Sequence, residues 1–382
     1  MTTQRALIQS DSSTGPDDLP IIVNSAAALP ELHSDYHVII RVLAVALNPI
    51  DYKNITHFPS PGQGVGSDFC GTVEKQGDSV YSTGLGLGTR VCGAVFPYNQ
   101  RGDADQTPQS TDYGAFSEWI VADARTLLRV PEEWTDLQGA ALGGVGWATV
   151  AMAMSDESAL ALAGVPSKPS DQKEPILVYG GATATGTMAC QMLNLSGYVP
   201  IAMTSTHSAS LATEYGAAGT AAYTSPSCSE TVKKLAKVPI RHAIDCITSP
   251  TSVAACFAAM ARTGGRYACL EALDDSWRTR KLIRVKEVMG YEALGQSTQL
   301  GTGLSAYSRE ANQVLFNQGQ LWKTELQTLL DAGSIKPHPI RELSGFWDKC
   351  ILEGLEMLRK GEVRGQKLVV RLSDKMTEPS TK

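Results

Sequence analysis

The stretch that decides the fold is VYGGATATGTMACQML, residues 178 to 193. An apolar run enters the glycine pair Gly180 and Gly181, small residues follow, and an apolar-periodic segment comes next. This order predicts a strand, a tight turn and a helix, which is how a βαβ unit begins its nucleotide site. The pattern G-x-G-x-x-G has Thr183 at its middle glycine here, and a glycine turn before a helix is often only a packing device.

The turn still has the properties that a pyrophosphate needs. Gly180 and Gly181 permit a tight turn, and Gly186 permits close packing of the helix against the strand. The small residues between them let the backbone approach the phosphates, and two threonine hydroxyls offer extra donors. We therefore predict cofactor contacts at Ala182, Thr183, Ala184 and Thr185.

The end of the second strand indicates which dinucleotide is bound. NAD-selective sites place a carboxylate about 20 residues after the turn, where it holds the ribose 2′-hydroxyl. This sequence has no Asp or Glu between Glu174 and Glu214, and its second strand ends in neutral hydrogen-bonding side chains. Such groups at a helix N-terminus accept a 2′-phosphate, and they are compatible with an ordinary Ser/Thr helix cap. We predict NADPH, held at Ser205, Thr206, His207 and Ser208.

The rest of the chain supports an α/β fold with two domains. Beyond a Pro/Ser/Lys-rich break at residues 164–175, strands and helices alternate at the spacing of parallel βαβ units. The first third reads instead as short strands separated by glycines. We predict a Rossmann-type parallel sheet over residues 161–311, and a β-rich domain made of residues 1–160 and 312–382.

Composition and charge exclude several classes of protein. Of the 382 residues, 43% are apolar and 19% are charged, as in an ordinary globular protein. The net charge of −6, without a long basic run, argues against nucleic-acid binding. No uninterrupted apolar stretch approaches about 20 residues, so no membrane span is expected. The eight cysteines are scattered and form no C-x-x-C pair, which suits reduced thiols and a cytoplasmic location.

Several motifs in a fixed order resemble the medium-chain dehydrogenase/reductase superfamily. They are NPID, GSDFCGTV, LGTRVCG, GAFSEWIV, AALGGVGWATVAMA, the nucleotide turn and KGEVRGQKLVVRL, and they extend over nearly the whole chain. Within this superfamily, GGATATGTMACQMLNLSGY, DCIT and RKGE resemble the fungal trans-acting enoyl reductases of the lovastatin type. The resemblance implies a GroES-like catalytic domain beside the Rossmann domain.

The same resemblance implies an activity and a partner. It implies an NADPH-dependent oxidoreductase of secondary metabolism that reduces the α,β double bond of a polyketide thioester on an acyl-carrier domain. The partner would be a polyketide synthase or a polyketide synthase–peptide synthetase hybrid, and the enzyme would be a monomer. Two alternatives remain: a stand-alone quinone or alkenal reductase with the same fold, and a non-catalytic nucleotide-binding protein.

The residues argue against the zinc-dependent branch of this superfamily. Where zinc alcohol dehydrogenases have Gly-His-Glu, this chain has Gly66, Ser67 and Asp68. A catalytic zinc needs three protein ligands, and a structural zinc needs four closely spaced ones. We therefore predict no metal, so hydride must go to an acceptor already activated by conjugation.

The segment after Asn48-Pro49 is the first candidate for catalysis. In the resembled family it reaches the cofactor, which implies cofactor contacts at Ile50, Asp51, Tyr52 and Lys53. Lys53 would hold the pyrophosphate or the reacting carbonyl, unless it is only an exposed lysine at a helix start. Tyr52 is a candidate proton donor, with packing as an alternative role and water as an alternative source of the proton.

Further cofactor contacts are implied by position alone. Tyr223 matches a residue near the adenosine end, and Leu270 and Glu271 match a segment near the nicotinamide. Glu271 stands where the lovastatin-type enzyme has a neutral amide, which puts its hydrogen-bonding role in doubt. Arg364 and Gly365, before the last strand, match another cofactor-contacting pair.

Two segments are implied to line the substrate cleft. They are Ala148, Thr149, Val150, Ala151, Met152, Ala153, Met154 and Ser155 on one side, and Tyr291, Glu292, Ala293, Leu294 and Gly295 on the other. Small and apolar side chains suit a polyketide chain, but the first segment could equally be a core helix. A local basic cluster could dock an acidic carrier domain or could simply be a solvated face: Arg278, Arg280, Lys281, Arg284 and Lys286.

Overall fold

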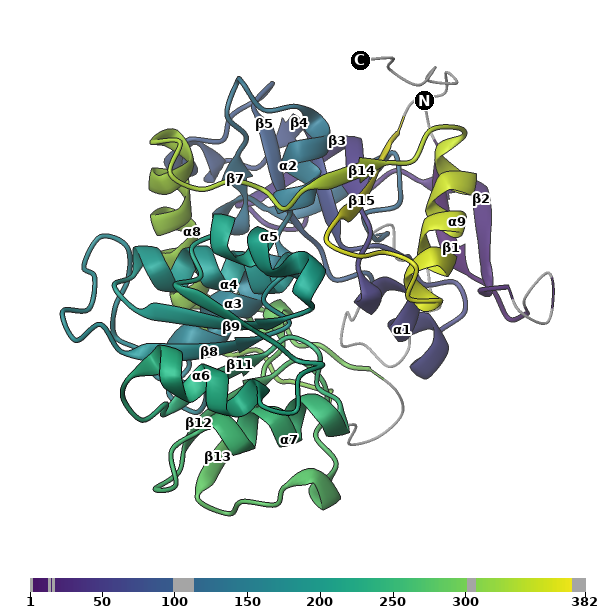
Figure 1. The fold of residues 1–382 in the computed structure, drawn as a ribbon. Helices are drawn as coiled ribbons and strands as arrows, with labels where there is room; N and C mark the ends of the chain where they lie inside the picture. Colours follow the sequence, from purple (N-terminus) through teal and green to yellow (C-terminus); the bar gives the residue numbers. More distant parts are fainter. Residues whose placement is uncertain (1–2, 13–14, 16–17, 99–112, 301–306, 373–382) are drawn as a thin grey trace. The chain divides into compact units, whose positions relative to one another are not determined.

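The structure is a computed structural model, and it describes residues 3–12, 15, 18–98, 113–300 and 307–372. The chain forms two compact units (Figure 1). The first contains residues 1–145, 294–312 and 326–382, and the second contains residues 146–293 and 313–325. These divisions differ from the predicted domain boundaries, because residues 146–160 and 313–325 belong to the second unit and residues 294–311 to the first.

The second unit is built on one parallel sheet. Its strands are β8 (Pro175–Tyr179), β9 (Val199–Thr204), β10 (Gly219–Ala222), β11 (His242–Asp245), β12 (Gly265–Cys269) and β13 (Ile283–Glu287). They lie in the order β10-β9-β8-β11-β12-β13, and every neighbouring pair is parallel. This is the strand order of a dinucleotide-binding Rossmann fold, in which successive strands are added on one side as far as β10 and on the other side from β11 onward. The predicted Rossmann-type sheet is confirmed.

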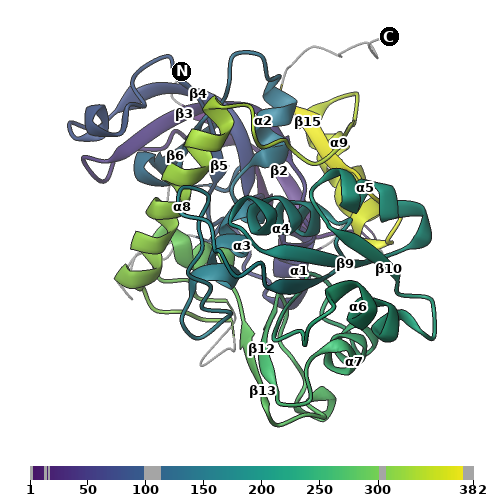
Figure 2. The same cartoon turned by 60° about the vertical axis from the view of Figure 1, so that its left-hand side comes forward.

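Helices cover both faces of this sheet. They are α3 (Val145–Ser155), α4 (Ala184–Leu195), α5 (Ala209–Glu214), α6 (Cys228–Ala236) and α7 (Pro250–Ala259), with the 3₁₀ helices η3 (Thr206–Ser208), η4 (Asp275–Trp277) and η5 (Gly290–Leu294). Figures 1 and 2 show α4 and α5 on one face and α6 and α7 on the other. Because both faces are covered, β8 is buried at every position, which explains its uninterrupted apolar sequence PILVY.

The first unit is β-rich. Its strands are β1 (Thr3–Gln9), β2 (Ile21–Ala28), β3 (His37–Ala46), β4 (Asp68–Gln76), β5 (Arg90–Ala94), β6 (Trp119–Asp123), β7 (Leu128–Arg129), β14 (Ile340–Glu342) and β15 (Lys367–Arg371). The main sheet has the order β14-β15-β3-β4-β5-β7, and β6 also pairs with β3. The C-terminal strand β15 therefore completes a sheet that begins near the N-terminus, with Val369 opposite Ala46 (Figure 1).

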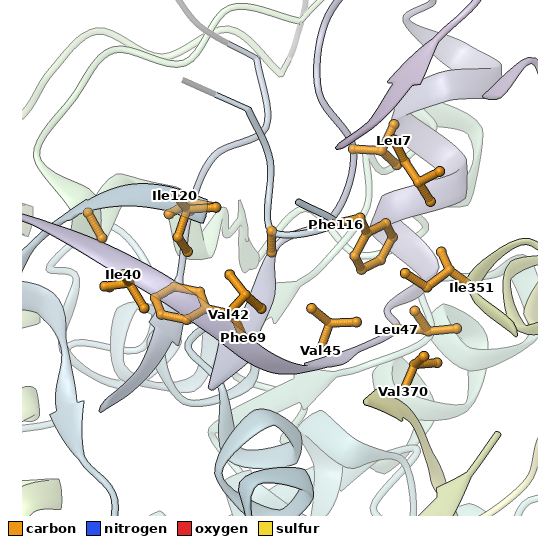
Figure 3. Packing of buried hydrophobic residues seen from close by; sticks show 14 of the residues in the cluster. Leu7, Ile40, Val42, Val45, Leu47, Phe69, Phe116, Ile120, Ile351 and Val370 are labelled. Atoms are coloured by element: carbon orange, nitrogen blue, oxygen red, sulfur yellow. The ribbon is translucent and has the colours of Figure 1, made fainter. Parts of the chain in front are cut away.

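The core of the first unit joins segments from both ends of the chain. Its longer helices are α1 (Pro49–His57), α2 (Asp136–Leu142) and α9 (Trp347–Arg359), while α8 (Gln313–Asp331) has residues in both units. Figure 3 shows side chains of β3 and β4 packed beside Phe116, with Ile351 of α9 and Val370 of β15 close by. Each of these buried side chains contributes roughly 1.5–3 kcal/mol to stability. Residues far apart in sequence thus share one core.

One apolar stretch, Asp136–Ser155, is long enough and apolar enough by composition to cross a membrane. In the structure 83% of it is buried inside the protein, and Gly143, at φ +49°, separates it into α2 and α3. These are the features of core helices in a globular fold. All eight cysteines are free thiols, and seven of them are buried.

Candidate functional site

In the turn between β8 and α4, three positions favour glycine, one because of its backbone conformation and two because the backbone packs closely against its neighbours. Gly180 has a left-handed φ of +73°. A Cβ atom on Gly186 would lie 2.1 Å from the carbonyl oxygen of Gly180, and one on Gly181 would lie 2.5 Å from the Cβ atom of Ala202. The backbone of the turn therefore packs directly against the first turn of α4 and against β9, and the side chains at the helix N-terminus are small.

Thr183, which replaces the middle glycine of the pattern, caps this helix. Its hydroxyl donates to the carbonyl oxygen of Gly180 at 2.8 Å and accepts the Gly186 N–H at 3.0 Å. The hydroxyl is thus used within the turn, which differs from its expected role as a phosphate donor. The N–H groups of Ala184 and Thr185 begin the helix, where geometry gives them no intrahelical acceptor, and both residues are half-buried. An anion such as a pyrophosphate fits these donors.

The predicted 2′-phosphate residues follow β9 directly. The Ser205 hydroxyl accepts the Ser208 N–H at 3.3 Å and so caps η3, while Thr206 and His207 are exposed. The backbone N–H of Tyr223, at the end of β10, donates to the Thr204 carbonyl at 3.0 Å. The carboxyl ends of β9 and β10 therefore bring these predicted cofactor residues together.

The two remaining residues predicted in this unit, Leu270 and Glu271, follow the carboxyl end of β12. The Leu270 N–H donates to the hydroxyl oxygen of Thr248 at 3.1 Å, and Glu271 is half-buried. In the first unit, Arg364 is exposed and Gly365 has a left-handed φ of +62° in the turn before β15.

The predicted catalytic segment forms the first turn of α1. Asp51 is 2% exposed, and its carboxylate accepts the Asn48 N–H at 2.7 Å and the Ser67 hydroxyl at 2.8 Å. Its carboxylate is therefore committed to holding the helix start. The Tyr52 ring packs against the core of the first unit, and Ile50, Tyr52 and Lys53 are all half-buried.

A buried charged cluster lies behind this helix start. The Asp68 carboxylate, fully buried, accepts the N–H groups of Gly144 and Val145 at 2.8 Å on one oxygen. Its other oxygen accepts the Asn48 amide at 2.9 Å and the Lys367 ammonium at 3.1 Å. The Lys367 ammonium also donates to the Asn48 side-chain oxygen. Every oxygen of this carboxylate is thus satisfied without solvent.

The electrostatics of the cluster raise the pKa of Asp51 to about 7. Burial is the main cause, and the nearby Asp68 carboxylate adds to it, whereas the hydrogen bonds from Asn48 and Ser67 and the Lys367 ammonium oppose it. Burial and Lys367 also lower the pKa of His338 to about 4. A single ammonium therefore compensates two neighbouring buried carboxyl groups.

This cluster contains Ser67 and Asp68 of the Gly-Ser-Asp motif, the residues from which no metal was predicted. The Ser67 hydroxyl donates to Asp51, and the Asp68 oxygens are occupied by hydrogen-bond donors. Among the residues that the structure describes, no group of three or more His, Cys, Asp or Glu side chains could hold a metal ion. This donor set does not fit a catalytic zinc.

Comparison with known proteins identifies the family. The model of the alcohol dehydrogenase GroES-like domain matches residues 34–132. Trans-enoyl reductase calK of Penicillium decumbens is 52% identical over 376 residues, covering 97% of this chain and 98% of that protein. The chain belongs to the trans-enoyl reductases. Trans-enoyl reductase sthE of Phaeosphaeria nodorum is 49% identical over 371 residues, covering 97% and 98% of the two chains.

The GroES-like and Rossmann architecture expected for this trans-enoyl reductase is also confirmed by a solved structure. CurK enoyl reductase superposes with a TM-score of 0.69 at 16% identity, covering 96% of this chain and 99% of that one. This likeness shows the medium-chain dehydrogenase/reductase fold, and the identity to trans-enoyl reductases makes the protein an oxidoreductase.

The predicted substrate segments of the trans-enoyl reductase are mostly buried. Every residue from Ala148 to Met154 is buried within α3, and the Ser155 hydroxyl accepts the Trp322 indole N–H at 2.6 Å. In η5, Tyr291, Glu292 and Ala293 are buried, while Leu294 and Gly295 are half-buried. Gly290, the first residue of η5, packs closely against α3: a Cβ atom on it would lie 2.5 Å from the Thr149 hydroxyl oxygen. Packing accounts for most of the α3 side chains.

One residue of the predicted basic cluster of the trans-enoyl reductase, Arg280, has a structural role. The Arg280 guanidinium donates to the carbonyl oxygens of Phe257, Met260 and Ala261, so it caps the C-terminal end of α7. Lys286 pairs with Asp156 at 3.8 Å, and Arg278 pairs with Asp275 at 3.4 Å. Lys281 and Arg284 are exposed. Arg280 is therefore not available for docking, contrary to the docking interpretation.

Sequence reasoning missed the groups that hold the site in place. Asp245, Thr248 and Tyr267 form a buried hydrogen-bonded chain at the carboxyl ends of β11 and β12, and Lys367 is the buried counter-ion of Asp68. The signal for Asp245 and Thr248 was the motif DCIT, a carboxylate at the end of an apolar strand followed by a hydroxyl, whereas Tyr267 lies outside that motif. Lys367 carried no such signal.

Proposed function

We propose that this chain is an NADPH-dependent enoyl reductase that acts in trans on a polyketide synthase or a polyketide synthase–peptide synthetase hybrid. Its substrate is the α,β-unsaturated thioester of a polyketide on an acyl-carrier domain. The observation that carries this proposal is the near full-length identity, 52% and 49%, to two trans-enoyl reductases.

The N-terminus of α4 supports a dinucleotide as the bound cofactor. The first-turn N–H groups of Ala184 and Thr185 lie at the positive end of the helix dipole, which favours a pyrophosphate. When bound, the nicotinamide supplies a hydride to the β-carbon of the substrate. Lys53 stabilises negative charge on the pyrophosphate or on the carbonyl oxygen as the enolate forms. The α-carbon then takes its proton from Tyr52 or from water.

The preference for NADPH over NADH is supported by the neutral surroundings of η3. A Ser205→Asp variant tests it, because aspartate caps a helix as well as serine does but adds a carboxylate beside the 2′-phosphate. We expect a repulsion of roughly 1–2 kcal/mol at a separation of several Å, which raises the KM for NADPH about tenfold and leaves that for NADH nearly unchanged. Ser205→Asn is the matched neutral control. Equal KM values for NADPH in both variants would contradict the assignment.

The reaction is tested by following NADPH oxidation with crotonyl-pantetheine thioester and with a simple quinone at matched concentration. Turnover of the thioester with little quinone activity supports the proposal. Turnover of the quinone alone would assign the chain as a stand-alone quinone reductase. Binding of NADPH without consumption by any activated alkene would assign it as a non-catalytic protein.

We also propose that the enzyme is a monomer and that it is cytoplasmic. The edge strand β13 has the sequence IRVKE, and charged side chains on an edge strand disfavour pairing with a second sheet. The eight free thiols suit a reducing compartment. A mass of 40.7 kDa by light scattering tests the monomer.

A further inference from the structure

A buried carboxylate organises the loop after β11. Asp245 is 0% exposed, and one of its oxygens accepts the N–H groups of Ile247 and Thr248, both at 2.9 Å. Its other oxygen accepts the Tyr267 hydroxyl at 2.6 Å. Burial raises the pKa of Tyr267, so this hydroxyl remains a donor. Three donors thus converge on one carboxylate, two from the loop after β11 and one from the adjacent strand β12.

These bonds hold Thr248 in an uncommon conformation. Its φ of +57° is left-handed, which is rare for a β-branched residue. In this conformation its hydroxyl donates to the Asp245 carbonyl at 3.4 Å and accepts the Leu270 N–H at 3.1 Å. A strained residue that persists because its surroundings fix it is typical of a functional position.

The loop lies at the place where the fold binds its ligand. The Cys246 N–H donates to the Tyr179 carbonyl at 3.0 Å, which joins the loop to the end of β8. Ile247 is 43% exposed and lies 3.1 Å from where a Cβ atom on Gly180 would be. In this strand order a dinucleotide binds outside the carboxyl ends of β8 and β11. The loop therefore connects the phosphate turn with the segment after β12, and β8, β11 and β12 lie side by side in Figure 1.

We propose that Asp245, acting through the Thr248 hydroxyl, is a positioning residue for hydride transfer. It fixes the position of the Leu270 backbone relative to the Gly180 turn, and so the position of the nicotinamide relative to the pyrophosphate. This inference rests on the proposed function, because it assigns the Leu270 segment to the nicotinamide end. Neither Asp245 nor Thr248 needs to touch the substrate.

The test compares Thr248→Val, which keeps the shape and removes the hydroxyl, with Thr248→Ser, which keeps the hydroxyl. We expect Thr248→Val to lower kcat for NADPH-dependent thioester reduction about 10- to 100-fold, since small misplacements of reacting groups have effects of this size. The NADPH Kd should change less than threefold. The primary isotope effect with deuterated NADPH should rise as hydride transfer becomes limiting. Thr248→Ser should recover most of the rate.

Hydrogen exchange distinguishes this inference from the proposed function. Loss of the bond to the Thr248 hydroxyl should speed exchange of the Leu270 amide roughly threefold to tenfold in Thr248→Val, whatever the substrate. A wild-type protein that reduces no thioester would refute the proposed function but leave this measurement valid. Unchanged exchange, or unchanged kcat and isotope effect in a folded variant, would overturn the positioning role.

A second variant covers the case in which Thr248→Val does not fold. Tyr267→Phe removes one of the three donors to Asp245 and leaves the ring in place. We expect a smaller loss of kcat, about threefold to tenfold, with the NADPH Kd again nearly constant. Equal losses in Thr248→Val and Thr248→Ser, or no change in Tyr267→Phe, would mean that the hydroxyl chain has no positioning role.

Discussion

Replacing Lys367 with methionine removes the only ammonium described within the buried cluster of the first unit. Lys367 is 6% exposed and Asp68 is fully buried, so the substitution leaves a buried carboxylate without its counter-ion. Breaking a buried pair in this way costs about 3–5 kcal/mol. For a unit of this size, that corresponds to a fall in Tm of roughly 6–20 °C.

The double variant Lys367→Met with Asp68→Asn separates this charge effect from lost packing. In it, the Asn48 amide can turn its oxygen toward the new side-chain amide at position 68, so both side chains remain hydrogen-bonded. We expect the double variant to recover at least half of the stability lost in Lys367→Met. Urea unfolding, followed by tryptophan fluorescence, measures the three free energies of unfolding.

The loss in Lys367→Met should also depend on pH. The ammonium lowers the pKa of Asp51, so its removal raises that pKa above its present value of about 7. Near pH 6 Asp51 is protonated in both proteins, whereas at pH 8.5 it is charged in the wild type at a smaller cost than in the variant. The difference in free energy of unfolding should therefore grow from pH 6 to pH 8.5. If Lys367→Met lowers the free energy of unfolding by less than about 1 kcal/mol, or if the difference does not increase from pH 6 to pH 8.5, this account is refuted.

Three further measurements test other features. Between about pH 4 and pH 7 the Asp51 carboxyl binds a proton only in the folded protein, so the free energy of unfolding of the wild type should decrease by up to about 4 kcal/mol as pH rises through this range. This decrease should be absent in Asp51→Asn. Parallel pH profiles of the two proteins would contradict the prediction. Gly186→Ala should lose about 3 kcal/mol or more of stability together with NADPH binding measured by fluorescence, whereas Gly146→Ala, which faces open space, should change stability by less than about 0.5 kcal/mol. The pKa of every cysteine thiol is raised by burial, so the native protein should react slowly with DTNB at pH 8 and rapidly once unfolded; fast labelling of a native thiol would show an exposed, activated cysteine.

The Rossmann sheet could be predicted because its signals are local. The run before Gly180 is buried along its whole length, and the small residues after it fit the start of α4. The alternation of strands and helices then determines a parallel sheet. The role of Thr183 was harder to predict, because a hydroxyl at that position can face either a phosphate or the turn. In the structure its hydroxyl bonds to Gly180 and Gly186.

The buried polar groups could not be predicted, because their partners are distant in sequence. Lys367 and Asp68 are 299 residues apart, and nothing near either residue indicates the other. The guanidinium of Arg280 was read as surface charge, yet it bonds to carbonyl oxygens about 20 residues earlier. Charge patterns in sequence report composition, whereas burial is decided by tertiary packing.

The pairing of β15 with β3 has a consequence for synthesis of the protein. Ala46 leaves the ribosome long before Val369, its partner in the sheet. At 5–20 residues per second, the interval is roughly 15 seconds to one minute. Throughout this time the β3 residues Ala44, Val45 and Ala46 lack their partners in β15, and the Asp68 carboxylate lacks Lys367. We expect a nascent chain in this state to expose the apolar end of β3, to bind chaperones, and to be sensitive to any truncation that removes β15.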